Sequence, residues 1–240
     1  MNIAVIFAGG VGKRMKSKGG VPKQFLKVNG KPIIIHTLEK FENNSNIDAI
    51  VISCVKGYID KLNKIIDDFK ITKVRKVVIG GENGQESIYN GLKAAKEISI
   101  SDDDIVLIHD GVRPLIDDEL INNNIKTVQE KGSAITCVDC KETIILVDDN
   151  NDIKNVTDRD RTKIARAPQS FKLNEILEIH NKAIKDGNTN MIDSCTLMRK
   201  YKKKLNIVMG SSENIKITTP DDYYIFKALL DAKENSEIFT

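Results

Sequence analysis

A glycine-rich, basic loop near the N-terminus holds the residues most suited to chemistry. Gly9, Gly10 and Gly12 occupy three of four successive positions, directly after the apolar run of residues 3–8. Glycine lets the backbone turn tightly and approach a ligand closely, and exposed N–H groups in such a loop bind anions. Residues 1–38 contain seven Lys or Arg and no Asp or Glu. In a chain that is otherwise balanced in charge, this loop predicts a polyphosphate site; the alternative is a flexible basic surface loop.

Two familiar phosphate loops do not fit this sequence. A P-loop requires Ser or Thr after Gly-Lys, but Arg14 follows Gly12 and Lys13 here. The dinucleotide fingerprint requires a third glycine where Met15 stands. What remains is a G-G-x-G-x-R-M loop that is followed by Pro-Lys-Gln-Phe at residues 22–25. This glycine pattern disfavours a nicotinamide-dependent oxidoreductase, which is the alternative of another enzyme class.

The elements that must position this loop alternate along the first half of the chain. Short runs rich in Val and Ile are typical of buried parallel strands, and the amphipathic stretches between them predict helices. This order favours an α/β fold with a mostly parallel, twisted sheet and helices on both faces. The predicted strands are residues 3–8, 49–54, 74–79 and 105–109, and the predicted helices are residues 32–41, 58–69, 87–98 and 117–130.

The second half of the chain departs from this alternation. Residues 133–147 contain two short apolar runs, and a turn at 148–152 separates them from an apolar stretch at 153–157. This pattern predicts an inserted antiparallel ribbon, whose unpaired edges dimerisation could cover. We therefore expect a single domain over residues 1–240, with a projecting arm at 133–160 that serves as a dimerisation element. Helices at 173–186, 194–200 and 220–234 and a strand at 214–218 complete the prediction.

Composition excludes several classes of protein. The chain has 240 residues, of which 40% are hydrophobic and 30% charged, as in a soluble globular domain. A net charge of +3 predicts no nucleic-acid partner and no anionic membrane. No apolar window is long enough to span a bilayer, and the N-terminus lacks the basic region of a signal peptide. We expect a cytoplasmic protein with four reduced cysteines; Cys137 and Cys140 have CxxC spacing, but a strand-like sequence surrounds them.

The loop and five further segments resemble the CTP-dependent cytidylyltransferases that act on polyol phosphates, a branch of the nucleotidyltransferases. The resemblance covers nearly the whole chain, and the motifs keep the order and spacing of that family. It implies a Rossmann-like nucleotidyltransferase fold, a homodimer, CTP and a small polyol phosphate as substrates, and Mg²⁺ held mainly by the CTP phosphates. The further segments are Gly-Gly at 80–81 with ESIYNGL at 86–92, HDGVRP at 109–114, Asp-Arg at 158–159, PQSF at 168–171 and NIKITTP at 214–220.

The resemblance also implies a role for individual residues. In this chemistry a phosphate oxygen attacks the α-phosphorus of CTP and pyrophosphate leaves, so catalysis consists mainly of positioning and charge stabilisation. Catalysis falls to Arg14 and Lys23 on the CTP phosphates, Lys216 on the attacking phosphate, and Arg159. The nucleotide-binding residues are Phe7, Ala8, Gly9, Gly10, Gly12, Gly80, Gly81, Glu82 and Ser87. The acceptor-binding residues are Asp110, Arg113, Thr143, Arg159 and Lys216, of which Thr143 and Arg159 reach the partner subunit's site.

Three of these assignments have a plain structural alternative. Ser87 could be a helix N-cap, and Asp110 could simply pair with Arg113. Lys216 lies in an apolar stretch read as a strand; because lysine is rarely buried without a partner, this favours a functional role. We expect His109 to be structural, since the attacking phosphate is already an anion and needs no base.

The identity of the acceptor depends on where the sequence departs from the family pattern. Ala167 and Ile192 stand where many members have threonine, which leaves fewer hydroxyl groups on the acceptor side. The segment Phe-Ala-Gly-Gly at 7–10 resembles the ribitol-phosphate branch more than the methylerythritol-phosphate branch. We expect ribitol 5-phosphate as the acceptor, with 2-C-methyl-D-erythritol 4-phosphate as the alternative.

Overall fold

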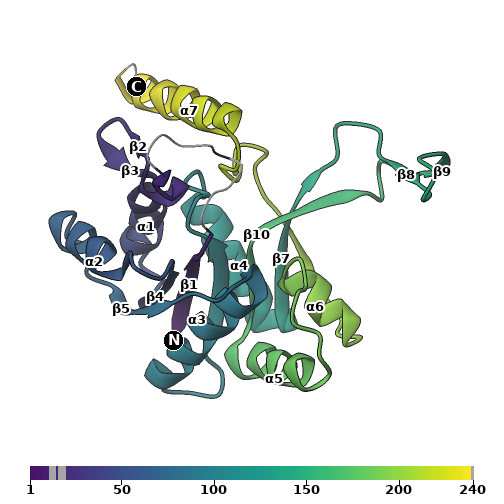
Figure 1. The fold of residues 1–240 in the computed structure, drawn as a ribbon, viewed down its shortest axis with the longest axis horizontal. Coiled ribbons are helices and arrows are strands. Elements are labelled where there is room, and N and C mark those ends of the chain that lie inside the picture. The colour runs from purple at the N-terminus through teal and green to yellow at the C-terminus, as the bar shows by residue number, and fades with distance from the viewer. Residues whose placement is uncertain (11–14, 16–19, 239–240) are drawn as a thin grey trace.

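A twisted, mostly parallel sheet forms the centre of the protein (Figure 1). The computed structural model describes residues 1–10, 15 and 20–238, and within these residues the sheet has seven strands in the order β11-β7-β10-β6-β1-β4-β5. Every neighbouring pair is parallel except the two that involve β10. This confirms the predicted fold class. The strands are β1 (Asn2–Ala8), β4 (Ala49–Cys54), β5 (Val74–Ile79), β6 (Ile105–Asp110), β7 (Ser133–Asp139), β10 (Lys163–Lys172) and β11 (Ile207–Met209).

Helices cover both faces of this sheet. Alternate residues of β1 point to opposite faces, so Ala4 and Ile6 join one apolar core while Ile3 and Val5 join the other. Helices α1 (Ile33–Asn43), α2 (Ile59–Asp68) and α4 (Asp118–Lys131) pack on the first face. Helices α3 (Gly84–Ile98), α5 (Leu173–Lys185) and α6 (Ser194–Lys200) pack on the second. Strands buried on both faces explain why the sequence of β1, β4 and β6 is almost continuously apolar.

A third, smaller apolar cluster joins the C-terminal helix to the region of the N-terminal loop. Phe226 of α7 (Pro220–Ile238) packs with Met15, Val28 and Ile217 in this cluster. A short 3₁₀ turn, η3 (Lys23–Phe25), and the small hairpin of β2 (Lys27–Val28) and β3 (Lys31–Pro32) lie between the loop and α1. The cluster therefore holds residues that follow the glycines of the N-terminal loop against α7 and the segment that precedes it. None of the described helices is both long enough and apolar enough to cross a bilayer.

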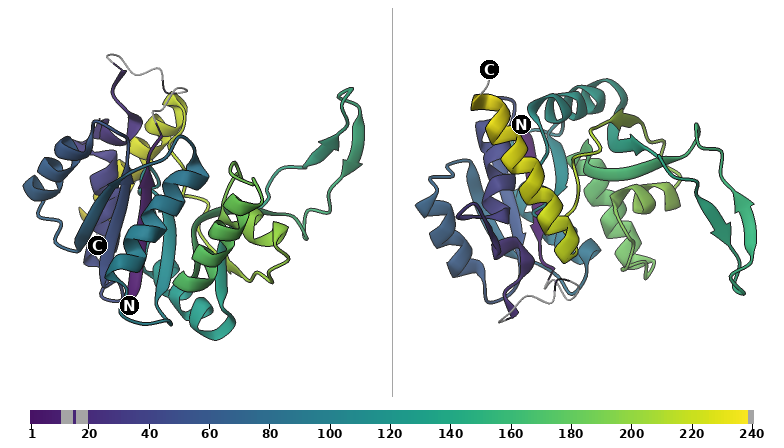
Figure 2. Two further views of the ribbon diagram at one scale, coloured as in Figure 1. Left: turned by 60° about the horizontal axis from the view of Figure 1, so that its bottom comes forward. Right: turned by 90° about the horizontal axis from the view of Figure 1, so that it is seen from above.

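A ribbon projects from the sheet, as the sequence predicts, but it is shorter than the predicted arm. Strands β8 (Ile145–Val147) and β9 (Ile153–Val156) pair antiparallel and stand away from the body of the molecule (Figures 1 and 2). The first residues of the predicted arm, 133–138, are instead buried in β7, which lies between β11 and β10 in the sheet. Because β7 pairs with β11 on one side and β10 on the other, it belongs to the sheet, and the projecting ribbon begins only after β7.

Two elements differ from the prediction. Residues 214–218 were predicted as a strand but form none. Ile215 and Ile217 both pack in the cluster with α7, and this alternation gives the sequence the apolar pattern of a strand. Strand β10 was not predicted, because Pro168 interrupts its sequence and proline is rare inside strands. The pairing of β10 with β7 shifts register between Ala165 and Gln169, where that proline lies. The missed strand forms the only antiparallel neighbour of β6 among the described residues.

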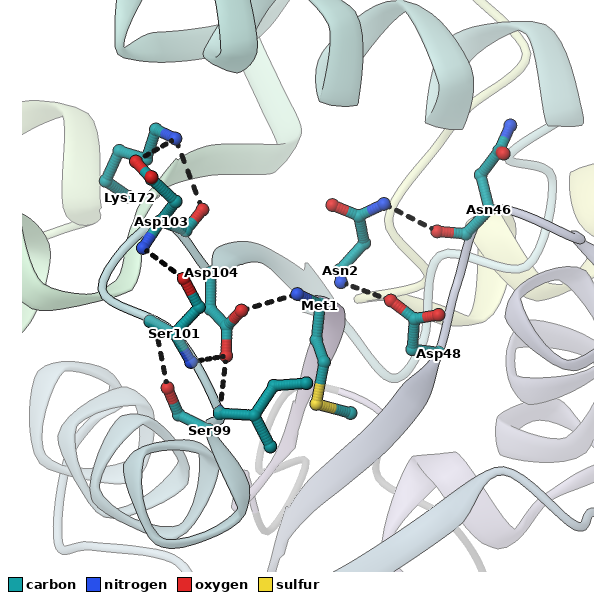
Figure 3. Close-up of polar contacts among 10 residues, drawn as sticks. Met1, Asn2, Asn46, Asp48, Ser99, Ser101, Asp103, Asp104 and Lys172 are labelled. Carbon is teal, nitrogen blue, oxygen red and sulfur yellow. Dashed lines mark hydrogen bonds and ion pairs between the residues drawn. The ribbon is translucent and has the colours of Figure 1, made fainter.

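Polar contacts fix the amino end of β1 (Figure 3). The ammonium group of Met1 forms an ion pair with the buried carboxylate of Asp104, which also accepts hydrogen bonds from the amides of Ile100 and Ser101. The Asn2 amide donates to Asp48, just before β4, at 2.6 Å. These contacts tie β1 to the starts of β6 and β4. The carboxyl ends of the three strands consequently meet at the opposite edge of the sheet.

Candidate active site

A cleft of about 680 Å³ lies at the carboxyl ends of β1, β4, β5 and β6. In open α/β sheets this edge is where ligands bind. The glycine-rich loop, the loop between β5 and α3, and the segment before α7 form its walls. The predicted site residues that line it are Phe7, Ala8, Gly9, Gly10, Lys23, Gly80, Gly81, Glu82, Ser87, Asp110 and Lys216. Gly12 and Arg14 lie outside the described residues.

Two loops touch through glycines at the base of the cleft. A Cβ atom on Gly9 would lie 2.5 Å from the Ser87 hydroxyl oxygen, and one on Gly80 would lie 3.2 Å from the Cα atom of Gly9. Real Cβ atoms essentially never come within 3.0 Å of such an atom, so a side chain at Gly9 would force Ser87 and its loop to shift. Gly10, by contrast, has open space around it. Glycine at position 9 is therefore required by packing between the two walls.

Ser87 holds the second loop in place. Its hydroxyl accepts a hydrogen bond from the amide of Gly81 at 2.9 Å and donates one to the carbonyl of Asn83 at 2.8 Å. The N-cap of α3 is Asn83, whose side chain accepts from the Glu86 amide at 2.9 Å. The alternative of Ser87 as an N-cap is therefore wrong. Ser87 instead presents the backbone of residues 80–82 at the N-terminus of α3, where a helix dipole favours an anion.

The turn at residues 23–25 reaches both walls of the cleft. The Lys23 ammonium donates to the carbonyl of Ile217 at 2.8 Å, which places its charge between the glycine-rich loop and the segment before α7. Gln24 is buried and donates to the carbonyl of Ala8 at 2.7 Å. Gln24 lines the cleft but is absent from the predicted site residues, although it lies in the Pro-Lys-Gln-Phe motif. Its function is to hold the carboxyl end of β1.

Asp110, the last residue of β6, lies at the centre of the charged groups. Its side chain is only 6% exposed; one carboxylate oxygen lies 2.6 Å from the Lys216 ammonium and the other 3.2 Å from the Arg113 guanidinium. Burial alone would raise the pKa of Asp110, but Lys216 and Arg113 outweigh it and hold the pKa at about 2. The group is therefore a carboxylate at every physiological pH.

Lys216 contacts both Phe7, on the wall of the cleft, and the carboxylate of Asp110. Its ammonium lies 5.6 Å from the centre of the Phe7 ring as well as beside Asp110. The expectation of a lysine within an apolar strand is wrong, because the segment is irregular and the Lys216 side chain is 41% exposed. The adjacent Ile217 is buried, and its amide donates to the carbonyl of Val112 at 2.9 Å. This anchor directs Lys216 into the cleft.

Arg113 and His109 are buried next to Asp110, outside the cleft lining. Arg113 is 7% exposed, does not line the cleft, and donates to the carbonyl of Asn214 at 2.6 Å. Its pairing with Asp110 supports the structural alternative for these two residues. His109 is fully buried, with one ring nitrogen 3.0 Å from the carbonyl of Arg113, and burial lowers its pKa to about 4. It is neutral and shielded from the cleft, as expected of a structural residue.

Thr143 and Arg159 lie on the arm, away from this cleft. The Arg159 guanidinium donates to the Thr143 hydroxyl at 3.0 Å, and both side chains are exposed. Neither residue lines the chain's own cleft. One chain therefore brings together the nucleotide residues, Lys23, Asp110 and Lys216, but not these two.

The cysteines form no ligand set. All four are free; Cys137 lies within β7 and Cys140 directly after it, in agreement with the strand pattern. Among the described residues, no group of three or more His, Cys, Asp or Glu side chains could hold a metal. The carboxylates that line the cleft belong to Glu82, Glu86 and Asp110.

The α/β sheet, the glycine-walled cleft at its carboxyl edge and the cations along that cleft define a nucleotidyltransferase. The chain belongs to the family described as 2-C-methyl-D-erythritol 4-phosphate cytidylyltransferase, which matches residues 2–232. It is 57% identical over 239 residues to a ribitol-5-phosphate cytidylyltransferase of Streptococcus agalactiae serotype III (strain NEM316), covering 100% of this chain and 99% of that relative.

Two further comparisons concern the methylerythritol branch. A 2-C-methyl-D-erythritol 4-phosphate cytidylyltransferase of Clostridium botulinum (strain 657 / Type Ba4) is 38% identical, with 96% of this chain and 97% of that relative covered. The crystal structure of 4-diphosphocytidyl-2C-methyl-D-erythritol synthase from Anaerococcus prevotii superimposes with a TM-score of 0.82 at 27% identity, over 96% of each chain. Both the sequence and the fold therefore identify a cytidylyltransferase.

Proposed function

We propose that this cytidylyltransferase transfers the cytidylyl group of CTP to D-ribitol 5-phosphate, which yields CDP-ribitol and pyrophosphate. The observation that carries the proposal is the 57% identity, over the full length of the chain, to a relative named for ribitol 5-phosphate. A relative named for 2-C-methyl-D-erythritol 4-phosphate has a lower sequence identity to this chain, 38%. The segment Phe-Ala-Gly-Gly at 7–10 supports the same assignment. 2-C-methyl-D-erythritol 4-phosphate remains the alternative acceptor.

The geometry of the cleft supports a direct displacement. An oxygen of the acceptor phosphate forms a bond to the α-phosphorus, while the bond from that phosphorus to the pyrophosphate oxygen breaks. The backbone of the glycine-rich loop and of residues 80–82 holds the nucleotide, with Phe7 on its wall. Lys23 and Lys216 lie where negative charge builds up, and such fixed charges are more effective there than mobile water. The attacking group is an anion, so no base is needed, in agreement with the buried His109.

We propose Mg²⁺ as the cofactor, bound mainly through the CTP phosphates. This mode fits the chain, because Mg²⁺ commonly binds substrate phosphates with one or two carboxylates rather than a protein cage. Asp110 is the carboxylate beside the cations of the cleft, and its two oxygens already contact Lys216 and Arg113. When bound, the ion would neutralise charge on the phosphates. The CTP phosphates, rather than a set of protein side chains, would supply most of its ligands.

We propose a homodimer in which the arm of each chain reaches its partner's cleft. The arm exposes an apolar surface that one chain leaves uncovered, since Ile145, Leu146, Val147, Ile153 and Val156 are all exposed. Thr143 and Arg159 lie on the same arm, paired with each other and remote from their own cleft. In the dimer, they would contact the acceptor.

We also propose a cytoplasmic location, which the four free thiols support.

An assay of pyrophosphate release tests the acceptor. Purified protein receives CTP and Mg²⁺ together with ribitol 5-phosphate or 2-C-methyl-D-erythritol 4-phosphate at equal concentration. We expect kcat/KM to be higher for ribitol 5-phosphate by at least tenfold. A preference for 2-C-methyl-D-erythritol 4-phosphate would assign the alternative. Calorimetric binding of NAD in place of CTP would contradict the nucleotide assignment itself.

A further inference from the structure

Arg166 is half-buried beside Arg113, just outside the residues that line the cleft, and none of the assigned roles explains it. It lies on β10, which runs antiparallel to β6 with Gln169 opposite Ile108. Residues that precede Gln169 on β10 therefore extend past the end of β6, on the side of Asp110. The Arg166 guanidinium donates to the carbonyls of Ser212 at 3.0 Å and Asn214 at 2.7 Å. In Figure 1, β10 passes beside the yellow-green segment that leads to α7 and contains these carbonyls.

Two arginines converge on one backbone oxygen at this point. Arg113 donates to the same Asn214 carbonyl at 2.6 Å, so the two guanidinium groups are neighbours. Burial lowers the pKa of Arg166, and the charge of Arg113 lowers it further. Two adjacent cations in a half-buried position repel each other unless an anion lies between them or nearby.

The described residues supply too little negative charge for this group of cations. Asp110 is the carboxylate partner of both Arg113 and Lys216. Among the described residues, no carboxylate lies within ion-pair distance of Arg166. Arg113, Arg166 and Lys216 thus carry three positive charges against one negative charge. The surplus of two matches the charge of a phosphate monoester dianion.

We propose that Arg166 binds the phosphate group of the acceptor, together with Lys216, and so selects phosphorylated acceptors. The inference rests on the proposed function only in that the acceptor is a phosphate monoester. Ala167, the next residue, has no side-chain donor, and its carbonyl accepts from the Asn214 side chain at 2.8 Å. Both hydrogen bonds from Arg166 to the carbonyls of Ser212 and Asn214 come from a single guanidinium nitrogen, Nη1. The remaining N–H groups of the fork suit a phosphate, which arginine binds through two parallel hydrogen bonds.

A purely structural role for Arg166 makes different predictions. If Arg166 only clamps residues 212–214, its loss would displace the segment that carries Lys216 and would lower the melting temperature and kcat together. If Arg166 binds phosphate, its loss would weaken binding of the acceptor, raise the acceptor KM and leave CTP binding intact. The variant Arg166→Gln retains a side-chain amide that can donate to the Asn214 carbonyl, and Arg166→Lys retains the charge.

The experiment measures pyrophosphate release at saturating CTP while the acceptor is varied, with calorimetry for CTP affinity. The acceptor is whichever of the two polyol phosphates the wild-type protein uses, so a wrong choice of polyol does not affect the test. Inorganic phosphate serves as a competitive inhibitor against that acceptor. The matched control is Arg199→Gln on α6, because Arg199 also donates to a backbone carbonyl, that of Lys203, at 2.8 Å.

For Arg166→Gln we expect the acceptor KM and the inhibition constant of inorganic phosphate each to rise by about 10-fold to 100-fold, as for the loss of a charge-assisted contact. The CTP dissociation constant and the melting temperature should stay near the wild-type values, and Arg166→Lys should recover part of the loss. Arg199→Gln should behave as wild type. Unchanged acceptor KM and phosphate inhibition in Arg166→Gln would overturn the proposal, as would a rise in acceptor KM that comes with a clear fall in the melting temperature or in CTP affinity.

Discussion

Replacing Lys216 by alanine should separate catalysis from stability. The Lys216 side chain is 41% exposed, and its main partner, Asp110, keeps a second cation in Arg113. Exposed ion pairs contribute about 0–1 kcal/mol, because water screens the charge that remains exposed. We therefore expect Lys216→Ala to lower the free energy of unfolding by about 1 kcal/mol, which for a chain of this size shifts the melting temperature by about 2–4 °C.

The effect of the same substitution on rate should be much larger. Lys216 directs a positive charge into the cleft from a backbone that the Ile217–Val112 hydrogen bond fixes. Removal of one such preorganised group costs about 10²–10³ in kcat, which corresponds to about 2.7–4 kcal/mol. The CTP dissociation constant should change by less than about threefold, because the backbone of the two glycine loops carries most of the nucleotide contact.

The assay pairs pyrophosphate release, for kcat, with calorimetry for CTP and thermal unfolding for stability. The matched control is Lys203→Ala; the Lys203 side chain is 37% exposed and forms a 2.8 Å ion pair with Glu175 outside the cleft. The control should lose as little stability as Lys216→Ala and keep its rate. Turnover of Lys216→Ala near the wild-type value would remove Lys216 from the mechanism, and a CTP affinity that falls in step with kcat would make it a nucleotide-binding residue instead.

Three further changes test other parts of the account. Gly9→Ala should weaken CTP binding by about tenfold or more, since its Cβ would lie 2.5 Å from the Ser87 oxygen, whereas Gly10→Ala, in open space, should be tolerated; calorimetry compares the two. Lys23→Ala should lower kcat by about 10²–10³ through loss of charge stabilisation, and an unchanged rate would contradict its role. Burial alone would raise the pKa of Asp104, but the hydrogen bond from the N-terminal ammonium and those from nearby amides lower it below the ordinary value of 3.8. Its contribution to stability is therefore present above pH 3.8 and is lost as the pH falls through the folded pKa. The difference in unfolding free energy between wild type and Asp104→Asn should shrink over that interval; a constant difference from pH 7 to pH 3 would show that the charge is not responsible.

The parallel half of the sheet could be predicted from sequence alone. The bounds of β4 and β5 agree with the prediction residue for residue, and those of β1 and β6 differ by one residue at one end. Strands β1, β4 and β6 are buried on both faces and leave an almost continuous apolar signal that depends little on their neighbours. The glycine-rich loop and Lys23 were likewise visible in the sequence, because residue type and charge alone distinguish them.

Features that depend on distant contacts could not be predicted in this way. Strand β10 is held by β6 and β7 despite Pro168, and the segment of Lys216 is fixed by α7 and Val112 rather than by a ladder. Gln24 has no pattern of its own; its function follows from one hydrogen bond to Ala8. The burial of Arg113 beside Asp110 could be seen only in the structure, because the spacing of the two residues in the sequence fits pairing and acceptor binding equally well.

The central claim is that CTP binds between the glycine-rich loop and residues 80–87. A crystal structure of the protein soaked with CTP and Mg²⁺ tests it most directly. We predict the phosphates beside Gly9, Gly10 and Lys23, and the cytidine against Phe7 and the Gly80-Gly81 backbone. Nucleotide bound at any other surface, with this cleft holding only solvent, would contradict the account.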